Sequence, residues 1–395
     1  MTDVLAGIRV LDFGRYIAGP YCAEILAQFG AEVIRIEKPT GGEDRYTTPV
    51  TDDGTGAMFL QMNCNKRGIT LHPGKPEGRE IVRRLVGTAD VVLANLVPAA
   101  LKRIGLDYES LRSIKQDIIL TAVSTFGSVG PYSDRPGFDA VAQAMSGSVD
   151  MGGFPGQPMK SFAPYVDYGT GVFAALGTFA ALMHKQQTGR GQKVEGALLA
   201  TALAFNNSPI IEQALLQLNR VGSGNRAQHV APSDIFKTRD GRAIVIQVVG
   251  NPLFERWAKL LGAEDWIDDP RFSSDASRGD NGALISQRAA AWCAERTQDQ
   301  ALAELEAARV PAGPVVTVQE AQDDSHVQAM GLFNPVEFPG LAHPAPVASA
   351  PVQLSESPPK ITSQPPLLGE HTDVVLAELG YSKSDVAEFR RKRVI

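Results

Sequence analysis

The first 40 residues repeat an apolar pattern that few folds can accommodate. Apolar runs over Gly7–Phe13 and Ala31–Glu37 predict two buried strands. Between them, Pro20 stands where a helix would take its first turn, and Gly30 stands where that helix would end. A strand, a helix and a second strand within about 30 residues make a βαβ unit, whose crossover implies parallel strands. The start of the chain therefore predicts an α/β fold with a Rossmann-like layer.

The alternation of strand and helix patterns continues along the first third of the chain. Ala89–Ala94 and Ile118–Val123 are further strand candidates, and each follows a helical pattern, over Pro76–Val86 and Tyr108–Lys115 respectively. Strands that alternate with helices in this way are typical of a parallel sheet with helices on its faces. We expect this part of the chain to form one such sheet.

Beyond about residue 140 the pattern changes and predicts a second domain. Thr170–Lys185 is apolar on nearly all sides of a helix, which predicts burial in a core or in a subunit interface. Asp234–Ile246 has the pattern of a hairpin that turns at Asp240–Gly241. Because 395 residues exceed what one hydrophobic core usually serves, we expect a smaller α+β domain from this hairpin to about Gln328. The Pro-rich stretch Pro335–Pro366 predicts an extended linker.

Basic side chains recur where the predicted strands end or in the loops that follow them. The set comprises Arg15, Lys38, Lys66, Arg67, Lys102, Arg103 and Arg135. In an open parallel sheet, ligands bind at the carboxyl edge of the strands. The whole chain is acidic, with 38 Lys and Arg against 44 Asp and Glu and a net charge of -6, which argues against broad binding to nucleic acid or an anionic membrane. A local cation cluster in an acidic protein predicts a polyphosphate ligand.

Several common kinds of site do not fit the sequence. The first predicted βα turn, Gly14–Pro20, has neither the G-x-G-x-x-G fingerprint of dinucleotide enzymes nor the Lys and Ser or Thr of a P-loop. The six histidines lack zinc-ligand spacing, and Cys22, Cys64 and Cys293 are too scattered for a metal or disulfide framework, so we expect no metal site. The cysteine usage and a start unlike a signal peptide favour the cytoplasm. The longest apolar run, Gly171–Met183, is too short to span a bilayer.

Asp167 is the strongest catalytic candidate, because it stands just before the long apolar helix. One interpretation is that its carboxylate caps the amino terminus of that helix, which would stabilise the helix by about 0.5–2 kcal/mol. The same position would keep the acid ionised, and the amides of Gly169 and Gly171 would be placed to stabilise an oxyanion. A carboxylate in this setting can attack an activated acyl group. The residues alone leave both roles open.

Short motifs recur in a fixed order along nearly the whole chain. They are Val10–Phe13, Ala18–Pro20, Phe29–Pro39, Asn65–Ile69, Gly130–Tyr132, Arg135–Asp139, Ala142–Gly147, Thr188–Gln192 and Leu368–Thr372. In this order and spacing they resemble the class III CoA-transferases, the family of formyl-CoA transferase and alpha-methylacyl-CoA racemase. The resemblance implies a Rossmann-like large domain and a smaller domain in an interlocked homodimer.

The resemblance also implies that both ends of the chain build the large domain. The implied large, CoA-binding domain is 1–215 with 345–395, the small domain is 225–328, and the linkers are 216–224 and 329–344. The middle of the chain would then be an insertion into the large domain.

In this family the Asp of a D-x-x-T-G motif attacks the acyl-CoA thioester, and Asp167 matches it, with Thr170 and Gly171 completing the motif. The resemblance thus implies a transferase that moves CoA from an acyl-CoA, with succinyl-CoA a possible donor, to a free carboxylic acid. The path would pass through an aspartyl-acyl anhydride, an aspartyl-CoA thioester and a second anhydride. An anhydride is as activated as the thioester it replaces, which suits a carboxylate nucleophile. No tightly bound cofactor is implied, since CoA and acyl-CoA are substrates.

The resemblance assigns the CoA contacts by position. They are Arg15, Ile17, Ala18, Lys38, Asn65, Lys66, Leu71, Asn95 and Arg103. We add Arg135 from the cation set. The chain departs from the family at Asn95–Ala99, where the family often reads N-F-[RK]-P-G and this chain lacks the basic residue.

Two other functions fit parts of the sequence. One is a racemase or epimerase of 2-methylacyl-CoA, but racemase relatives carry His in a G-H-D motif where this chain has Gly137–Phe138–Asp139, and Phe138 cannot move a proton. The other is a non-catalytic acyl-CoA-binding protein, in which Asp167 is only a helix cap. An NAD oxidoreductase fits the sequence less well than either, because the first predicted βα turn lacks the glycine fingerprint.

Overall fold

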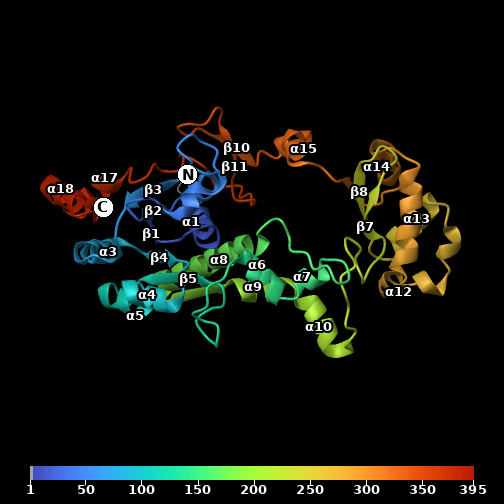
Figure 1. Ribbon diagram of the computed structural model, residues 1–395, viewed down its shortest axis with the longest axis horizontal. Helices are drawn as coiled ribbons and strands as arrows, with labels where there is room; N and C mark the ends of the chain where they lie inside the picture. Colours follow the sequence, from blue (N-terminus) through green and yellow to red (C-terminus); the bar gives the residue numbers. More distant parts are fainter. Residues whose placement is uncertain (1–2) are drawn as a thin grey trace. The chain divides into compact units, whose positions relative to one another are not determined.

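The predicted βαβ unit is present in the computed structural model, which describes residues 3–395 (Figure 1). It consists of β1 (Arg9–Asp12), α1 (Ala18–Gln28) and β2 (Glu32–Glu37). β1 and β2 are parallel neighbours in the sheet. Gly30 follows α1 with a φ of 95°, which glycine adopts without steric cost, so the helix ends near the predicted position.

Four more strands extend this unit into a six-stranded parallel sheet with the order β3-β2-β1-β4-β5-β6. They are β3 (Lys66–Thr70), β4 (Val91–Ala94), β5 (Ile119–Ser124) and β6 (Lys193–Ala197). The α/β prediction is confirmed. The strand order reverses between β1 and β4, and the loops that follow strands at such a reversal are where doubly wound sheets bind ligands.

We expected Lys66 and Arg67, as members of the cation set, to lie at the carboxyl end of a strand or in the loop after it. The structure places them elsewhere. They begin β3 and therefore lie at its amino end. β3 is hard to recognise in the sequence because it is short and starts with two charged residues.

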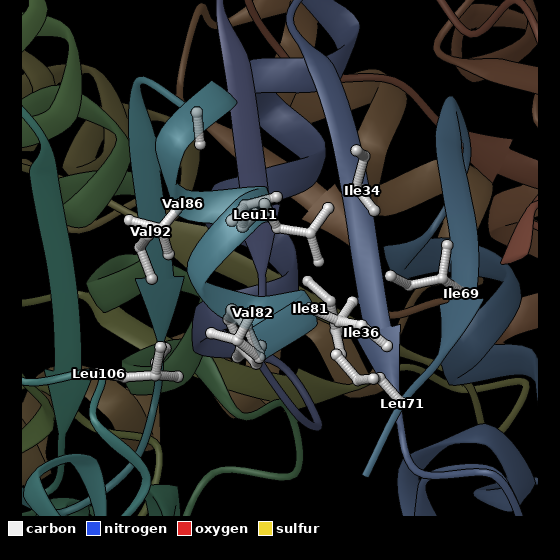
Figure 2. Close-up of a cluster of buried hydrophobic side chains, with 14 of the residues drawn as sticks. Leu11, Ile34, Ile36, Ile69, Leu71, Ile81, Val82, Val86, Val92 and Leu106 are labelled. Carbon is white, nitrogen blue, oxygen red and sulfur yellow. The ribbon is translucent and has the colours of Figure 1, made fainter. Parts of the chain in front are cut away.

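Apolar residues alternate along the strands and form a core on each face of the sheet. Leu11 and Ile34 face one side, which is covered by α3 (Pro76–Thr88) (Figure 2). Val10 and Val33 face the other side, which is covered by α1 and by the longest helix, α8 (Tyr165–Thr188). Successive side chains of a strand point to opposite faces, so a continuous apolar run is required where both faces are covered.

The remaining helices of the larger part of the chain include both of those near its carboxyl end. They are α2 (Ala57–Met62), α4 (Pro98–Ile104), α5 (Tyr108–Ile114), α6 (Asp139–Met145), α8 (Tyr165–Thr188), α9 (Leu198–Phe205), α17 (Thr372–Glu378) and α18 (Lys383–Arg391). A further helix, α10 (Asn207–Leu216), crosses from this part into the smaller one. Val375 of α17 and Val386 of α18 join the core under α3. The carboxyl end of the chain therefore packs against the sheet that the amino-terminal residues begin.

α8 is long and apolar enough, by length and composition, to cross a membrane, with a mean hydropathy of 1.3 over 18 residues. It is longer than the run Gly171–Met183 on which the sequence-based exclusion rested. Its Ala174 and Ala175 are buried in the core that it shares with α1 and the sheet. This packing identifies α8 as a core helix of the larger unit.

The chain divides into two compact units. The larger contains the chain up to Ser146 together with Phe162–Ile211 and Met330–Ile395, and the smaller contains Gly147–Ser161 and Glu212–Ala329. Residues 147–161 belong with the smaller unit because, for example, Gly224 N donates a 2.8 Å hydrogen bond to Gly153 O. The domain bounds implied by the resemblance remain our prediction.

The smaller unit has a three-stranded antiparallel sheet of β7 (Ser233–Lys237), β8 (Ala243–Gln247) and β9 (Ala312–Pro314). The hairpin predicted at Asp240–Gly241 joins β7 to β8. The longer helices are α11 (Asn251–Leu260), α13 (Gly282–Ala294) and α14 (Gln298–Ala307). They share a separate core that contains Trp257.

Part of the Pro-rich stretch is a hairpin rather than an extended linker. β10 (Phe333–Val336), inside the predicted linker 329–344, pairs antiparallel with β11 (Ala345–Ala348). Pro335 lies opposite Pro346. A proline has no N–H for a further neighbour, so this two-stranded ribbon tolerates residues that a central strand would not.

Candidate active site

Asp167 lies inside the first turn of α8 and does not cap it. The cap position is Pro164, which makes no side-chain hydrogen bond. The capping role belongs to Asp139, whose Oδ2 accepts 2.9 Å hydrogen bonds from the backbone N–H groups of Val166 and Asp167. The interpretation of Asp167 as a helix cap is therefore wrong, and its carboxylate is left for other chemistry.

The surroundings of the Asp167 carboxyl disfavour its charged form. Burial, and after it the neighbouring Asp139 carboxylate, raise the pKa of Asp167 from an ordinary value of 3.8 to about 7. No hydrogen-bond donor among residues 3–395 offsets this shift. A largely buried carboxyl without a stabilising partner is typical of a functional group.

The rest of the D-x-x-T-G motif serves packing. Thr170 is fully buried, and its Oγ1 lies 2.7 Å from the carbonyl oxygen of Val166. A Cβ on Gly171 would lie 2.9 Å from the carbonyl oxygen of Ala18, so glycine is what lets α1 approach α8. Gly169 and Gly171 both lie inside α8, whose own hydrogen bonds use their amides. These amides are not free to stabilise an oxyanion.

Gly171→Ala is expected to destabilise the protein by about 1–3 kcal/mol, because the added Cβ would crowd a backbone carbonyl that only a shift of α1 can move. Urea unfolding followed by circular dichroism would measure the change. Gly87→Ala is the matched control: Gly87 lies in α3 with no atom within 4 Å of an added Cβ, and alanine there should stabilise the helix by up to about 1 kcal/mol. Equal stabilities of the two variants would contradict the crowding at Gly171.

The loop between β1 and α1 is held in place at the reversal of strand order. Asn95, just after β4, accepts a 2.7 Å hydrogen bond from Arg15 N and donates a 2.6 Å hydrogen bond to Arg15 O. Tyr16 then takes a φ of 61°, which is rare for a bulky residue. Its ring meets Phe138 edge-on, with centroids 5.6 Å apart. The loop thus contacts the segment that carries Asp139.

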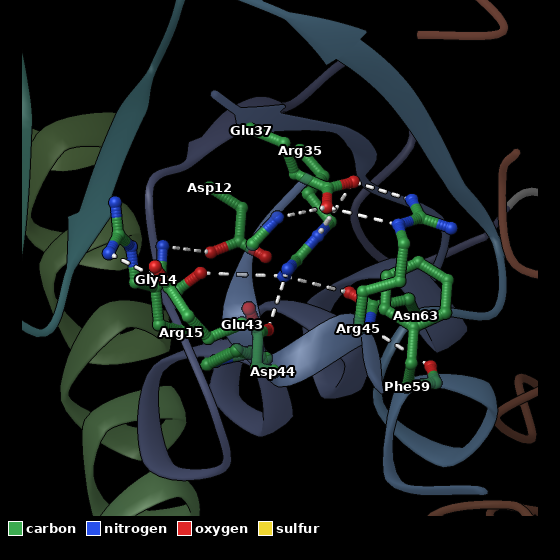
Figure 3. Close-up of polar contacts among 12 residues, drawn as sticks. Asp12, Gly14, Arg15, Arg35, Glu37, Glu43, Asp44, Arg45, Phe59 and Asn63 are labelled. Carbon is green, nitrogen blue, oxygen red and sulfur yellow. Dashed lines mark hydrogen bonds and ion pairs between the residues drawn. The ribbon is translucent and has the colours of Figure 1, made fainter. Parts of the chain in front are cut away.

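Arg15 and Lys38 are the two predicted CoA contacts whose charges the structure brings together. Between them lies the Glu43 carboxylate, which pairs with Lys38 Nζ and lies 3.4 Å from Arg15 Nη1. Figure 3 labels Arg15 and Glu43. The Arg15 and Lys38 side chains are 46% and 39% exposed. The loops after β1 and β2 therefore present two accessible cations at the carboxyl edge of the sheet.

Lys66, by contrast, is an internal residue. Its Nζ is buried and lies 2.8 Å from Asp12 Oδ2, 2.9 Å from Pro20 O and 3.1 Å from Asn63 Oδ1. Burial lowers the pKa of the Lys66 ammonium, and Asp12 opposes that shift. Three acceptors match its three donors. A contact between this ammonium and CoA would require the internal pair to open.

Four more predicted contacts have side chains that are buried or already bonded. Ile17, Ala18 and Leu71 belong to the hydrophobic core, which leaves only their backbone atoms for a ligand. The Asn65 Oδ1 accepts hydrogen bonds of 2.7 and 3.0 Å from the backbone of Thr362 and the following residue. Asn65 therefore ties the carboxyl-terminal segment to the start of β3.

Arg103 and Arg135 are surface cations. Arg103 is exposed in the last turn of α4, and Arg135 is exposed in the loop after β5, with its guanidinium 3.9 Å from the centre of the Tyr132 ring. Both follow strands on the far side of the reversal from Lys38.

A buried ion-pair network beneath the Lys38 loop was not predicted from the sequence (Figure 3). Arg35 Nη2 lies 2.6 Å from Asp44 Oδ2, and Arg45 Nη2 lies 2.6 Å from Glu37 Oε2. Burial alone would raise the pKa of Glu37, but the two guanidinium groups hold it below its usual value. The network fixes both ends of the loop that carries Lys38. The available signal was the pair of opposite charges, Arg35 and Glu37, which alternate with the apolar residues of this buried strand.

Comparison with known proteins relates the chain to a group of enzymes. A family model described as CoA-transferase family III matches residues 5–372. The chain is 35% identical to the succinyl-CoA--D-citramalate CoA-transferase of Chloroflexus aurantiacus, over 99% of this chain and 98% of that protein. It is 34% identical to the succinate--glutarate CoA-transferase of Agrobacterium fabrum, over 96% of this chain and 98% of that protein.

Solved structures are similar over the same length. A CAIB/BAIF family protein from Brucella suis matches with a TM-score of 0.83 at 31% identity, over 96% of this chain and 100% of that chain. Rv3272 from M. tuberculosis matches with a TM-score of 0.82 at 29% identity, over 95% of this chain and 99% of that chain. The likeness therefore covers the larger and the smaller unit alike.

Proposed function

Because the chain belongs to CoA-transferase family III and is an enzyme of that family, we propose that it moves CoA from an acyl-CoA to a free carboxylic acid with Asp167 as the nucleophile. The observation that carries this proposal is the Asp167 carboxyl, which is largely buried, lacks a hydrogen-bond donor among residues 3–395 and lies close to a second carboxylate. A carboxylate kept from stabilising partners is more basic and therefore a better nucleophile.

In the first half of the proposed reaction, an Asp167 oxygen attacks the thioester carbonyl carbon, the C–S bond breaks, and the CoA thiolate leaves a mixed anhydride behind. The thiolate then attacks the Asp167 carbonyl carbon, which releases the donor acid and forms an aspartyl-CoA thioester. The acceptor carboxylate attacks the carbonyl carbon of that thioester, the C–S bond breaks, and a second anhydride forms as the CoA thiolate is released. Attack of the thiolate on its acyl carbonyl yields the new acyl-CoA and restores the Asp167 carboxylate. Each step exchanges one activated acyl bond for another.

We further propose succinyl-CoA as a donor and a dicarboxylic acid as the acceptor. This rests on the names of two relatives, one for succinyl-CoA and D-citramalate and one for succinate and glutarate. For CoA itself, we propose that Arg15 and Lys38 bind phosphate groups, with Arg103 and Arg135 as further cations. Their accessibility supports this assignment, whereas the burial of Lys66 does not.

An interlocked homodimer in the cytoplasm, with a Rossmann-like large domain in each subunit, completes the proposal. The outward sides of α8 and α9 expose large apolar side chains. They are Val172, Phe173, Leu176, Met183, Leu203 and Phe205, each 38% exposed or more. An exposed apolar surface of this kind is typical of a subunit interface.

The test combines succinyl-CoA and other acyl-CoA donors with dicarboxylic and monocarboxylic acids and identifies the products by mass. The enzyme should form a new acyl-CoA only when donor and acceptor are both present, and hydroxylamine should trap Asp167 as its hydroxamate. Absence of that adduct, with activity surviving in Asp167→Ala, would overturn the proposal. Exchange of the α-hydrogen for deuterium without an acceptor would instead support a racemase, and binding of CoA without any turnover would support a binding protein.

A further inference from the structure

The carboxylate of Asp139 accepts hydrogen bonds from a side chain and from the backbone of the protein. Asp139 is 7% exposed and begins α6. Its Oδ1 accepts a hydrogen bond from Gln143 Nε2, and its Oδ2 accepts the two backbone hydrogen bonds from the first turn of α8. Both oxygens are therefore held by groups of the protein, in a side chain that is almost fully buried. Any effect that Asp139 has on the reaction must act through another residue.

That residue is Asp167, because one of the two backbone donors is its own N–H group. The first N–H groups of a helix have no partner within the helix, and α8 has no side-chain cap of its own. Asp139 supplies this cap from a separate helix, 28 residues earlier in the chain. The hydrogen bond fixes the backbone of the proposed nucleophile directly, without an intervening residue.

The Asp139 carboxylate is also the neighbouring charge that raises the pKa of Asp167. Of the elements packed against α8, α9 and β5 carry no titratable side chain, and α6 carries only Asp139. On β6, Glu195 is paired with Lys193. On α1, Cys22 contacts Thr178 further along α8, and Tyr21 and Glu24 raise the pKa of Tyr168 instead. Among residues 3–395, Asp139 is therefore the charged side chain that raises the pKa of Asp167, in addition to burial.

We propose that Asp139 is a positioning residue that holds the Asp167 carboxylate in place for attack and keeps it strongly nucleophilic through like-charge repulsion. The proposal rests on Asp167 being the nucleophile of the proposed function. Forming the anhydride converts the charged Asp167 into a neutral acyl group, while the negative charge leaves on the CoA thiolate. The repulsion from Asp139 is thus present before attack and relieved by it. A neutral residue in place of Asp139 loses this contribution.

Asp139→Asn is the informative variant, because its amide oxygen can still accept the backbone hydrogen bonds while the charge is lost. In a plot of kcat/KM for the acyl-CoA against pH, the midpoint of the acidic limb should move at least about one pH unit lower. The value of kcat/KM at pH 8.5 should fall roughly 10-fold. Asp107→Asn is the control: Asp107 caps α5 in the same way, accepting from Ser110 N, and its loss should leave the limb in place. An unchanged limb in Asp139→Asn, even with a lower melting temperature, would reduce Asp139 to a structural cap and overturn the proposal.

A second measurement does not depend on turnover. Water-soluble carbodiimide attacks protonated carboxyl groups, so the pH dependence of Asp167 labelling, followed by peptide mass, reports its protonation. The midpoint should shift to lower pH in Asp139→Asn and stay in place in Asp107→Asn. An unshifted midpoint would overturn the role of Asp139. A parent enzyme that shows no transfer in the donor and acceptor panel would overturn the proposed function, whatever the labelling midpoint.

Discussion

Asp167→Asn is expected to lose CoA-transfer activity by on the order of 10³-fold or more and yet to unfold at a higher temperature than the parent protein at pH 8. Activity is lost because an amide cannot form the anhydride. Stability rises because the native fold holds a carboxylate in surroundings that disfavour its charge, whereas the unfolded chain solvates it. Few substitutions at a partly buried position combine these two effects.

The pH dependence of this stabilisation follows from the raised pKa of Asp167, about 7 in the folded protein against an ordinary 3.8. The folded state binds the proton more tightly than the unfolded state, so the carboxyl costs stability increasingly as pH rises from about 4 to 7, and the cost is fully developed above pH 7. The gain at pH 8 should be on the order of 2–4 kcal/mol and should narrow toward pH 5. Thermal unfolding of both proteins at pH 5 and pH 8 measures it. Equal melting temperatures at pH 8 would show that the ionised Asp167 carboxylate does not destabilise the folded protein.

Lys66→Met is expected to destabilise the protein by about 3–5 kcal/mol, because it leaves the buried Asp12 carboxylate without its ammonium partner. Asp12 is 0% exposed and retains a single 2.7 Å hydrogen bond from Gly14 N. Denaturant unfolding at neutral pH measures the loss. The effect should be far larger than for any surface cation of the same chain.

Lys38→Met serves as the control for this second prediction, since the Lys38–Glu43 pair is exposed and should contribute less than about 1 kcal/mol. Adding Asp12→Asn to Lys66→Met should recover much of the lost stability, because the Asp12 position then carries no buried charge without its partner. The two lysine variants also separate structure from binding: Lys38→Met should raise KM for the acyl-CoA while the fold keeps its stability. Comparable stability losses for Lys38→Met and Lys66→Met would contradict the assignment of Lys66 to an internal ion pair.

The parts of the fold that were predictable are those with a local signal. The strands at residues 89–94 and 118–123 were found within two residues of β4 and β5 because apolar runs between helical patterns are visible in a short window. β3 was missed because Lys66 and Arg67 interrupt such a run. The hairpin of β10 and β11 was missed because its prolines resemble a linker, and only the pairing of two segments shows otherwise.

In the candidate site too, only the features with a local signal in the sequence were predictable. Asp167 was predicted as the catalytic residue because it precedes a long apolar helix and belongs to a recognisable motif, and this role remains our proposal. Its role as a cap was wrong because the true cap, Asp139, lies 28 residues earlier, and nothing local to either residue signals their contact. The Arg35 and Glu37 network went unpredicted for the same reason, since its partners Asp44 and Arg45 come from the following loop.

The sequence by itself predicted the parallel α/β architecture, the carboxylate that we propose as the nucleophile, and the cations that we propose for binding CoA. Each depends on residue type and on spacing along the chain. Only the tertiary structure decided which of these charges are available. Lys38 and Lys66 are the same residue type in the same predicted role, yet one is exposed and the other buried against Asp12, 54 residues away. Desolvation and pairing set the chemistry of a charge, and both depend on groups that only folding brings together.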